Sequence, residues 1–79
     1  MESVTFECQF NENARPYPII SWLYNEKPFK EDRWRIIYKN TLILKKVVDL
    51  NSGNYTCILS NGYHPQQRLV YNLTVLGKI

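Results

Sequence analysis

Two cysteines, Cys8 and Cys57, constrain the fold of this 79-residue chain more than any other feature of it. A chain this short buries too little surface to be robustly stable without a cross-link or a metal. A bond between them would close a loop of about 50 residues, and the loss of entropy in the unfolded chain would then stabilise the fold by about 4 kcal/mol. Both could also be buried thiols or weak metal ligands, but one cysteine pair and one histidine argue against a zinc site. We expect a disulfide, and therefore an oxidising compartment.

Alternation of polar and apolar residues, with β-branched and aromatic runs, recurs at short intervals, and no 3.6-residue periodicity persists. The pattern predicts an all-β protein with six or seven short strands, which fits a sandwich of two antiparallel sheets better than a closed barrel. The expected strands cover residues 4–10, 18–24, 35–38, 41–47, 53–59 and 68–76.

The residues around the two cysteines follow a recognisable order. Trp22 lies between them, and in a sandwich its indole would pack against a bridge joining strands of opposite sheets. Tyr55, two residues before the second cysteine, stands where a tyrosine hydroxyl can bond the backbone of the preceding turn. Leu42 and Leu44 share the inward face of their strand. The order Cys, Trp, Leu-x-Leu and Gly-x-Tyr-x-Cys is that of an immunoglobulin-like β-sandwich.

Two segments carry a resemblance to I-set immunoglobulin domains, and most of all to the second immunoglobulin-like domain of fibroblast growth factor receptors. Residues 22–30 read Trp-Leu-Tyr-Asn-Glu-Lys-Pro-Phe-Lys, where the family has Trp-Leu-x-Asn-x-Lys-x-Phe-Lys; Val47-Val48 is followed by Gly-Asn-Tyr-Thr-Cys at 53–57. The resemblance covers most of one such domain. It implies a single ligand-recognition domain, residues 1–79, of a growth factor receptor tyrosine kinase. Its partners would be a protein ligand or a neighbouring receptor domain, and heparan sulfate.

The sequence also departs from that family. Asn51 stands where an Asp usually pairs with an Arg at the start of the fourth strand, so a contact with Arg33 or Arg35 would be at best a neutral hydrogen bond. Thr5 and Glu7 lie in the strand where the receptors carry heparin-binding lysines. These two residues argue against heparin binding at the receptors' own position.

No stretch of the chain approaches the roughly 20 apolar residues of a membrane span, and the N-terminus lacks the apolar core of a signal peptide. We therefore expect no direct membrane insertion, and an extracellular piece excised from a larger cell-surface protein, with Met1 as an expression start. The net charge of +3 is too small for a nucleic-acid footprint.

Basic residues are nevertheless concentrated in one segment. Residues 27–46 contain seven bases and two acids, which leaves a local charge of +5. The simpler interpretation is a solvated surface, and the alternative is a patch for an acidic partner such as a sulfated polysaccharide. The candidate polyanion-binding residues are Lys27, Lys30, Arg33, Arg35 and Lys39. Trp34, between two of them, is either a binding residue or a cover for the sandwich edge.

The alternation also assigns faces, because residues two apart in a strand share a side of the sheet. Besides the residues named above, the expected core contains Val4, Phe6, Ile20, Leu73 and Val75. The outward set is Ile19, Ser21, Leu23, Thr56, Ile58, Val70, Asn72 and Thr74. Its four aliphatic members, Ile19, Leu23, Ile58 and Val70, predict a contiguous protein-binding face. A missing N-terminal strand or a neighbouring domain could instead cover part of it.

Asn54 and Asn72 each begin an Asn-x-Thr triplet and are possible N-glycosylation sites. Asn72 is the better candidate because it is predicted to face outward. Such triplets also arise by chance, and the one at Asn54 overlaps the tyrosine motif.

Catalysis is the least supported function. The single histidine, His64, is interpreted as a turn residue, both cysteines are committed to the bridge, and no Gly-rich phosphate loop is present. We expect no enzyme activity, cofactor or metal. The alternatives are a structural I-set module of an intracellular muscle-type protein, with reduced cysteines, or a cell-adhesion or soluble decoy domain. The two Asn-x-Thr triplets and the complete Cys-Trp-Cys core favour the extracellular receptor.

Overall fold

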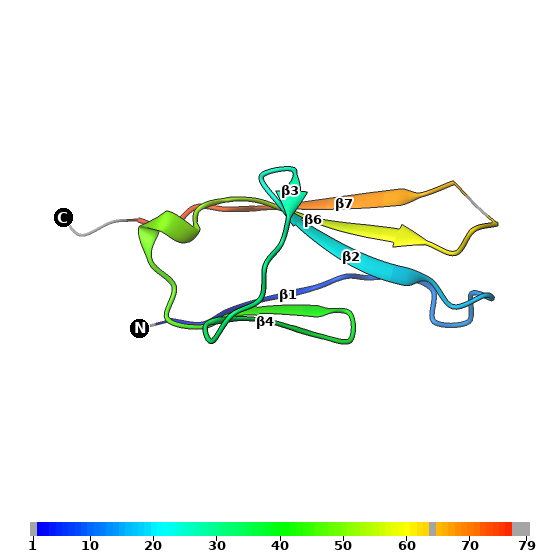
Figure 1. Cartoon of the computed structure of the whole chain (residues 1–79), viewed down its shortest axis with the longest axis horizontal. Coiled ribbons are helices and arrows are strands. Elements are labelled where there is room, and N and C mark those ends of the chain that lie inside the picture. The colour runs from blue at the N-terminus through cyan, green and yellow to red at the C-terminus, as the bar shows by residue number, and fades with distance from the viewer. Residues whose placement is uncertain (1, 64, 77–79) are drawn as a thin grey trace.

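The chain forms a sandwich of two antiparallel sheets in a computed structural model that describes residues 2–63 and 65–76 (Figure 1). One sheet has the order β1-β5-β4, with β1 at Val4–Glu7, β4 at Arg35–Tyr38 and β5 at Thr41–Leu44. The other has the order β3-β2-β6-β7, with β2 at Ile19–Tyr24, β3 at Lys27–Pro28, β6 at Gly53–Ser60 and β7 at Gln67–Leu73. A short 3-10 helix, η1, covers Asp49–Asn51. The predicted all-β fold is confirmed; Met1 and His64 lie outside the described residues.

The predicted strands 4–10 and 68–76 were too long, because β1 ends at Glu7 and β7 at Leu73. Two local features explain the other differences. Asn25 and Glu26 both have positive φ, 49° and 67°, and form a two-residue hairpin turn that adds the short strand β3. The sequence Asn-Glu lacks the glycine that marks such turns, so this strand was missed. β5 ends at Leu44 rather than at residue 47, because Lys46 adopts φ 52° and cannot continue an extended strand.

The core lies between the sheets around the Cys8–Cys57 disulfide, whose Cα atoms are 6.1 Å apart. Trp22 is 4% exposed and Tyr55 is 1% exposed, and Leu42 and Leu44 are fully buried, as predicted. The partly buried residues that pack against this cluster include Val4, Phe6, Ile20 and Leu73, together with Phe10, Tyr24, Phe29, Ile37, Val47, Leu69 and Tyr71. The assignment of Val75 to the core was wrong. It is half-buried and lies outside the cluster, because β7 already ends at Leu73.

Aromatic side chains extend the core along its length. Phe6 of β1 stacks on Tyr55 and on Tyr71, with ring centroids 5.2 and 5.4 Å apart, and so joins the two sheets. Tyr24 donates a hydrogen bond of 2.6 Å to the carbonyl of Ser52 just before β6. These contacts fix the β3-β2-β6-β7 sheet, whose outer side carries the first candidate surface.

Candidate functional site

The outer side of the β3-β2-β6-β7 sheet brings the four predicted aliphatic residues together. The strand register pairs Thr56 with Leu23 on one side and with Val70 on the other, and Ile58 is diagonal to both aliphatic residues. Ile19 is 73% exposed and Val70 is 58% exposed, whereas Leu23 and Ile58 are half-buried. We call Ile19, Leu23, Ile58 and Val70 the outer face; that it binds a protein stays a prediction.

Thr56 shows where a prediction from alternation fails. It lies on the outer side, as expected, but it is fully buried. Its hydroxyl lies 3.3 Å from Glu26 Oε2, and Arg68 of β7 pairs with the same carboxylate. Sequence reasoning did not single out Glu26 or Arg68. Their ion pair reaches from the β2–β3 turn to β7 and places a polar contact beside the aliphatic residues.

The predicted polyanion residues do not form one cluster. Lys27, Lys30 and Arg35 line a shallow cleft of about 300 Å³. Lys39 lies in the turn after β4, where its ammonium is 5.5 Å from the ring centroid of Tyr38. Arg33 instead lies over the ring of Trp34. The structure therefore brings together three of the five predicted residues.

Two cations contact the exposed indole ring of Trp34, one from the adjacent residue and one from the segment after β5. The ring is 40% exposed. Arg33 Cζ lies 5.7 Å from its centroid and Lys46 Nζ lies 4.2 Å from it. Contacts of this length are cation–π interactions, worth about 0.5–1 kcal/mol each at an exposed site. The structure thus shows Trp34 as a partly exposed ring within a basic cluster. That it is a binding residue, and not a cover for the sandwich edge, stays a prediction.

Asp32 organises this segment. Its carboxylate accepts hydrogen bonds from the guanidinium of Arg35 at 2.6 and 3.0 Å and from the amide of Trp34 at 2.8 Å. These bonds, first of all those from Arg35, hold the pKa of Asp32 below its usual value. The suggested contact between Asn51 and an arginine was wrong. Arg35 is taken by Asp32, and Asn51 Oδ1 accepts instead from the amide of Val48 at 2.7 Å.

The two predicted glycosylation residues are neighbours. Asn54 and Asn72 are directly opposite one another in β6 and β7, and both are exposed. The side-chain nitrogen of Asn72 donates to Asn54 Oδ1 at 2.6 Å. Whether either triplet is used stays a prediction.

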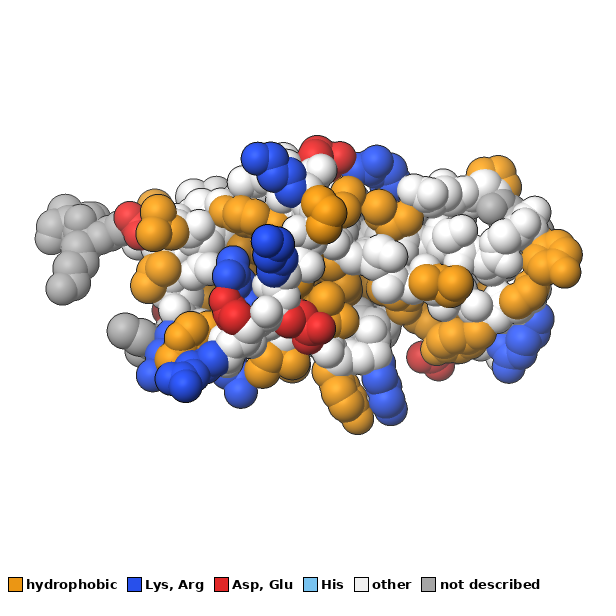
Figure 2. Space-filling view, viewed as in Figure 1, with side chains coloured by type: hydrophobic (Ala, Val, Ile, Leu, Met, Phe, Trp, Pro, Cys, Tyr) orange, Lys and Arg blue, Asp and Glu red, His pale blue; other side chains and the backbone are white. Residues whose placement is uncertain are grey.

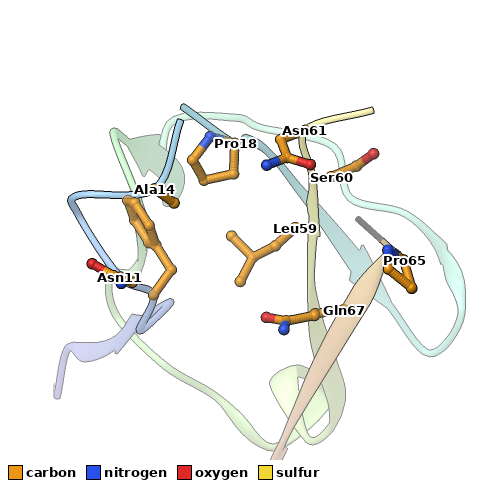
Figure 3. Close-up of a pocket in the computed structure, with 9 residues that line it drawn as sticks. Asn11, Ala14, Pro18, Leu59, Ser60, Asn61, Pro65 and Gln67 are labelled. Atoms are coloured by element: carbon orange, nitrogen blue, oxygen red, sulfur yellow. The ribbon is translucent and has the colours of Figure 1, made fainter. Parts of the chain in front are cut away.

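A small pocket of about 160 Å³ lies beside the last residues of β6. Leu59 points into it, with Asn11 and Ala14 on one side and Gln67 below (Figure 3). None of its described lining residues carries an acidic or basic side chain. Within residues 2–63 and 65–76, no group of three His, Cys, Asp or Glu side chains is placed to hold a metal ion. The same residues contain no helix long and apolar enough to span a bilayer.

Comparison with known proteins agrees with this architecture. Residues 1–61 match the family model described as an immunoglobulin domain. A curated relative, fibroblast growth factor receptor 1 of Xenopus laevis, is 37% identical over 67 residues, which cover 78% of this chain. The chain spans only 8% of that relative's length.

Solved structures show the same fold at low identity. The tandem Ig repeats of Dlar superpose with a TM-score of 0.81 at 19% identity, covering 96% of this chain and 40% of that one. The titin M3 domain gives 0.79 at 18%, covering 92% and 78%. Murine CEACAM1b gives 0.77 at 22%, covering 95% and 37%.

Proposed function

The chain belongs to the immunoglobulin domain family, and we propose that it is an extracellular ligand-recognition module of a cell-surface receptor of the growth factor receptor tyrosine kinase class. This family occurs in receptors and in titin, and its fold is not catalytic. The identity to a receptor over most of the chain supports the receptor alternative over the muscle-type one. The disulfide supports an oxidising compartment.

The exposure of Ile19 and Val70 is the observation that carries this proposal. Aliphatic side chains 73% and 58% exposed on one sheet are costly to leave in water, and covering them with a partner removes apolar area at about 25 cal/mol per Å². The Glu26–Arg68 pair beside them supplies polar groups that can orient a protein ligand. The outer face therefore combines exposed aliphatic side chains with an ion pair that contacts Thr56, between Leu23 and Val70.

The name of the receptor relative gives the first probes, the fibroblast growth factors. Binding of a panel of them to the immobilised domain is measured by surface plasmon resonance, for the wild type and for Ile19→Glu and Val70→Glu. Each variant places a charge at an exposed aliphatic position of the face, and we expect at least about a tenfold loss in affinity, or about 1.4 kcal/mol.

Leu50→Glu is the matched control, because Leu50 is 84% exposed in η1, away from the outer face. Its affinity should equal that of the wild type. If no growth factor binds, or if all three variants bind alike, the outer face is not the ligand site of a growth factor receptor.

We also propose a weaker contact with heparan sulfate through the cleft lined by Lys27, Lys30 and Arg35. Exposed cations attract a polyanion at long range, so binding should weaken steeply as salt shortens the Debye length from about 10 Å at 0.1 M to about 3 Å at 1 M. Retention on immobilised heparin tests it. Elution at or below physiological salt, unchanged by Lys27→Glu and Lys30→Glu, would mean that these residues are only a solvated surface.

A further inference from the structure

We propose that a second surface, the groove beside Trp34, binds an acidic peptide segment that also carries an apolar side chain. The Trp34 groove has a volume of about 400 Å³ and is lined by Trp34, Lys45, Lys46 and Val48, with the paired Asp32 and Arg35. Figure 2 shows blue side chains gathered around orange atoms at the lower left, where Figure 1 places the segment that leaves β5. This surface is separate from the outer face, so the inference goes beyond the function proposed above.

The groove is built before any ligand arrives. Asp32 Oδ1 accepts from the amides of Trp34 and Arg35 at 2.8 and 2.9 Å and so closes a tight turn. The amide of Lys45 then donates to the carbonyl of Trp34 at 2.7 Å and fastens this turn to the end of β5. A site fixed in this way loses little conformational freedom on binding, which favours affinity.

Lys46 adds an unusual backbone conformation to this arrangement. Its φ is 52°, in the left-handed region that side-chain-bearing residues rarely adopt and glycine adopts freely. The Lys46 ammonium lies 4.2 Å from the Trp34 centroid, and among the described residues it forms no ion pair. Strain of this kind persists where the surrounding structure enforces it, and such positions concentrate at binding sites.

The charge around the groove is positive and uncompensated. Among the described residues, the ion pairs are Arg35–Asp32 and Arg68–Glu26. Arg33, Lys45 and Lys46 therefore keep three positive charges beside Trp34 with no carboxylate partner. The fork of Arg33 can hold a carboxylate through two parallel hydrogen bonds. Charge complementarity thus selects an acidic partner.

The apolar lining selects a peptide among acidic partners. Trp34 is 40% exposed and Val48 is 45% exposed, so the groove offers an indole and an aliphatic side chain beside its cations. A peptide can fill it with one apolar side chain while neighbouring carboxylates reach the cations. A sulfated sugar chain would satisfy the cations but would leave Val48 without an apolar partner.

The probe is the peptide Glu-Asp-Leu-Asp-Glu-amide. Its N-terminus carries fluorescein for anisotropy measurements and an acetyl group for tryptophan quenching. The chain has two tryptophans, and Trp22 is buried, so protection from acrylamide quenching reports on Trp34. Lys46→Gly removes the charge and fits the left-handed backbone, and we expect the dissociation constant to rise at least about fivefold. Lys46→Gln removes the charge but retains a long polar side chain, and it repeats the test independently of the glycine.

Lys39→Gly is the matched control. Lys39 also has a positive φ, 55°, and also lies over an exposed ring, that of Tyr38, but at the other end of β4. The dissociation constant should not change in this variant. Peptides with Gln and Asn for Glu and Asp, or with Ser for Leu, should each bind more weakly.

Several outcomes would overturn the proposal. Equal affinity of Lys46→Gly, Lys46→Gln and wild type would exclude the Trp34 groove as the peptide site. Equal binding of the Leu and Ser peptides would leave only charge attraction, and the apolar lining would then have no part. A heparin hexasaccharide that binds in a Lys46-dependent way while the peptide does not would make this a polysaccharide site.

Discussion

The hydroxyl of Tyr55 donates a hydrogen bond of 2.5 Å to the backbone carbonyl of Asn51, four residues earlier. This bond ties η1 to the start of β6 and accounts for the tyrosine two residues before Cys57. Tyr55 is 1% exposed, and this burial raises the pKa of its hydroxyl to about 12. The neutral phenol is therefore the form that the folded state retains.

Alkaline pH should remove the contribution of Tyr55 to stability. In the unfolded chain the hydroxyl ionises near pH 10, whereas in the folded chain it keeps its proton up to about pH 12. The contribution is fully present below pH 10 and is lost as the pH rises through about 12. The difference in unfolding free energy between wild type and Tyr55→Phe, from urea titrations, should shrink by about 1.4 kcal/mol per pH unit in this window. A constant difference would contradict this assignment.

The disulfide predicts a mass and a stability change. The intact domain, purified without reductant, should weigh about 2 Da less than the reduced chain, because two hydrogens are lost on oxidation, and reduction should cost about 2–5 kcal/mol. A Cys8→Ala, Cys57→Ala double variant should be insensitive to reductant. Two titratable thiols in the native protein would favour the intracellular muscle-type module instead.

The two tryptophans should differ sharply in their contribution to stability. Replacing Trp22, which is 4% exposed in the core, by Ala should lower the unfolding free energy by about 3–5 kcal/mol. Replacing Trp34, which is 40% exposed, by Ala should cost no more than about 1–2 kcal/mol, because it removes only surface contacts, chiefly its two cation–π contacts. Thermal unfolding followed by circular dichroism measures both. A cooperative, wild-type-like transition for Trp22→Ala would mean that the core is not organised around this residue.

Gly53 should be far less tolerant of a side chain than Gly62. Both have positive φ, 146° and 80°, so alanine is strained at either position. At Gly53 an added Cβ would also lie 2.6 Å from Asn25 Oδ1 and 2.9 Å from Tyr24 Cε1, whereas at Gly62 it meets nothing within 4 Å. Gly53→Ala should lower the unfolding free energy by at least about 2 kcal/mol and Gly62→Ala by about 1 kcal/mol. Equal losses would show that φ alone determines the cost.

Asn54 and Asn72 should not both carry a glycan in the same folded molecule. They face one another across β6 and β7, with Asn72 Nδ2 2.6 Å from Asn54 Oδ1, and two glycans would leave from adjacent points. Expression with a secretion signal in mammalian cells, followed by intact mass measurement, should give at most one glycan per chain. Asn54→Gln should raise the glycan occupancy of Asn72. A folded species that carries two glycans would contradict the prediction.

The sequence by itself determined the fold class and the direction of most side chains. Period-2 alternation, anchored on Cys8, Trp22 and Cys57, placed Leu42 and Ile19 on the correct sides of their sheets, because this information is local. The sequence also identified the two Asn-x-Thr triplets, but it did not show that their asparagines lie opposite one another on neighbouring strands.

Only the tertiary structure decided which outward residues are accessible and which charges are free. Thr56 points outward yet is buried, because Glu26 and Arg68, 42 residues apart, meet beside it. Lys46 lies over Trp34 because the segment after β5 comes beside the turn that precedes β4, and its left-handed backbone is marked by no local pattern. Periodicity gives the direction of a side chain, whereas coverage and charge pairing depend on which distant turns and strands come together.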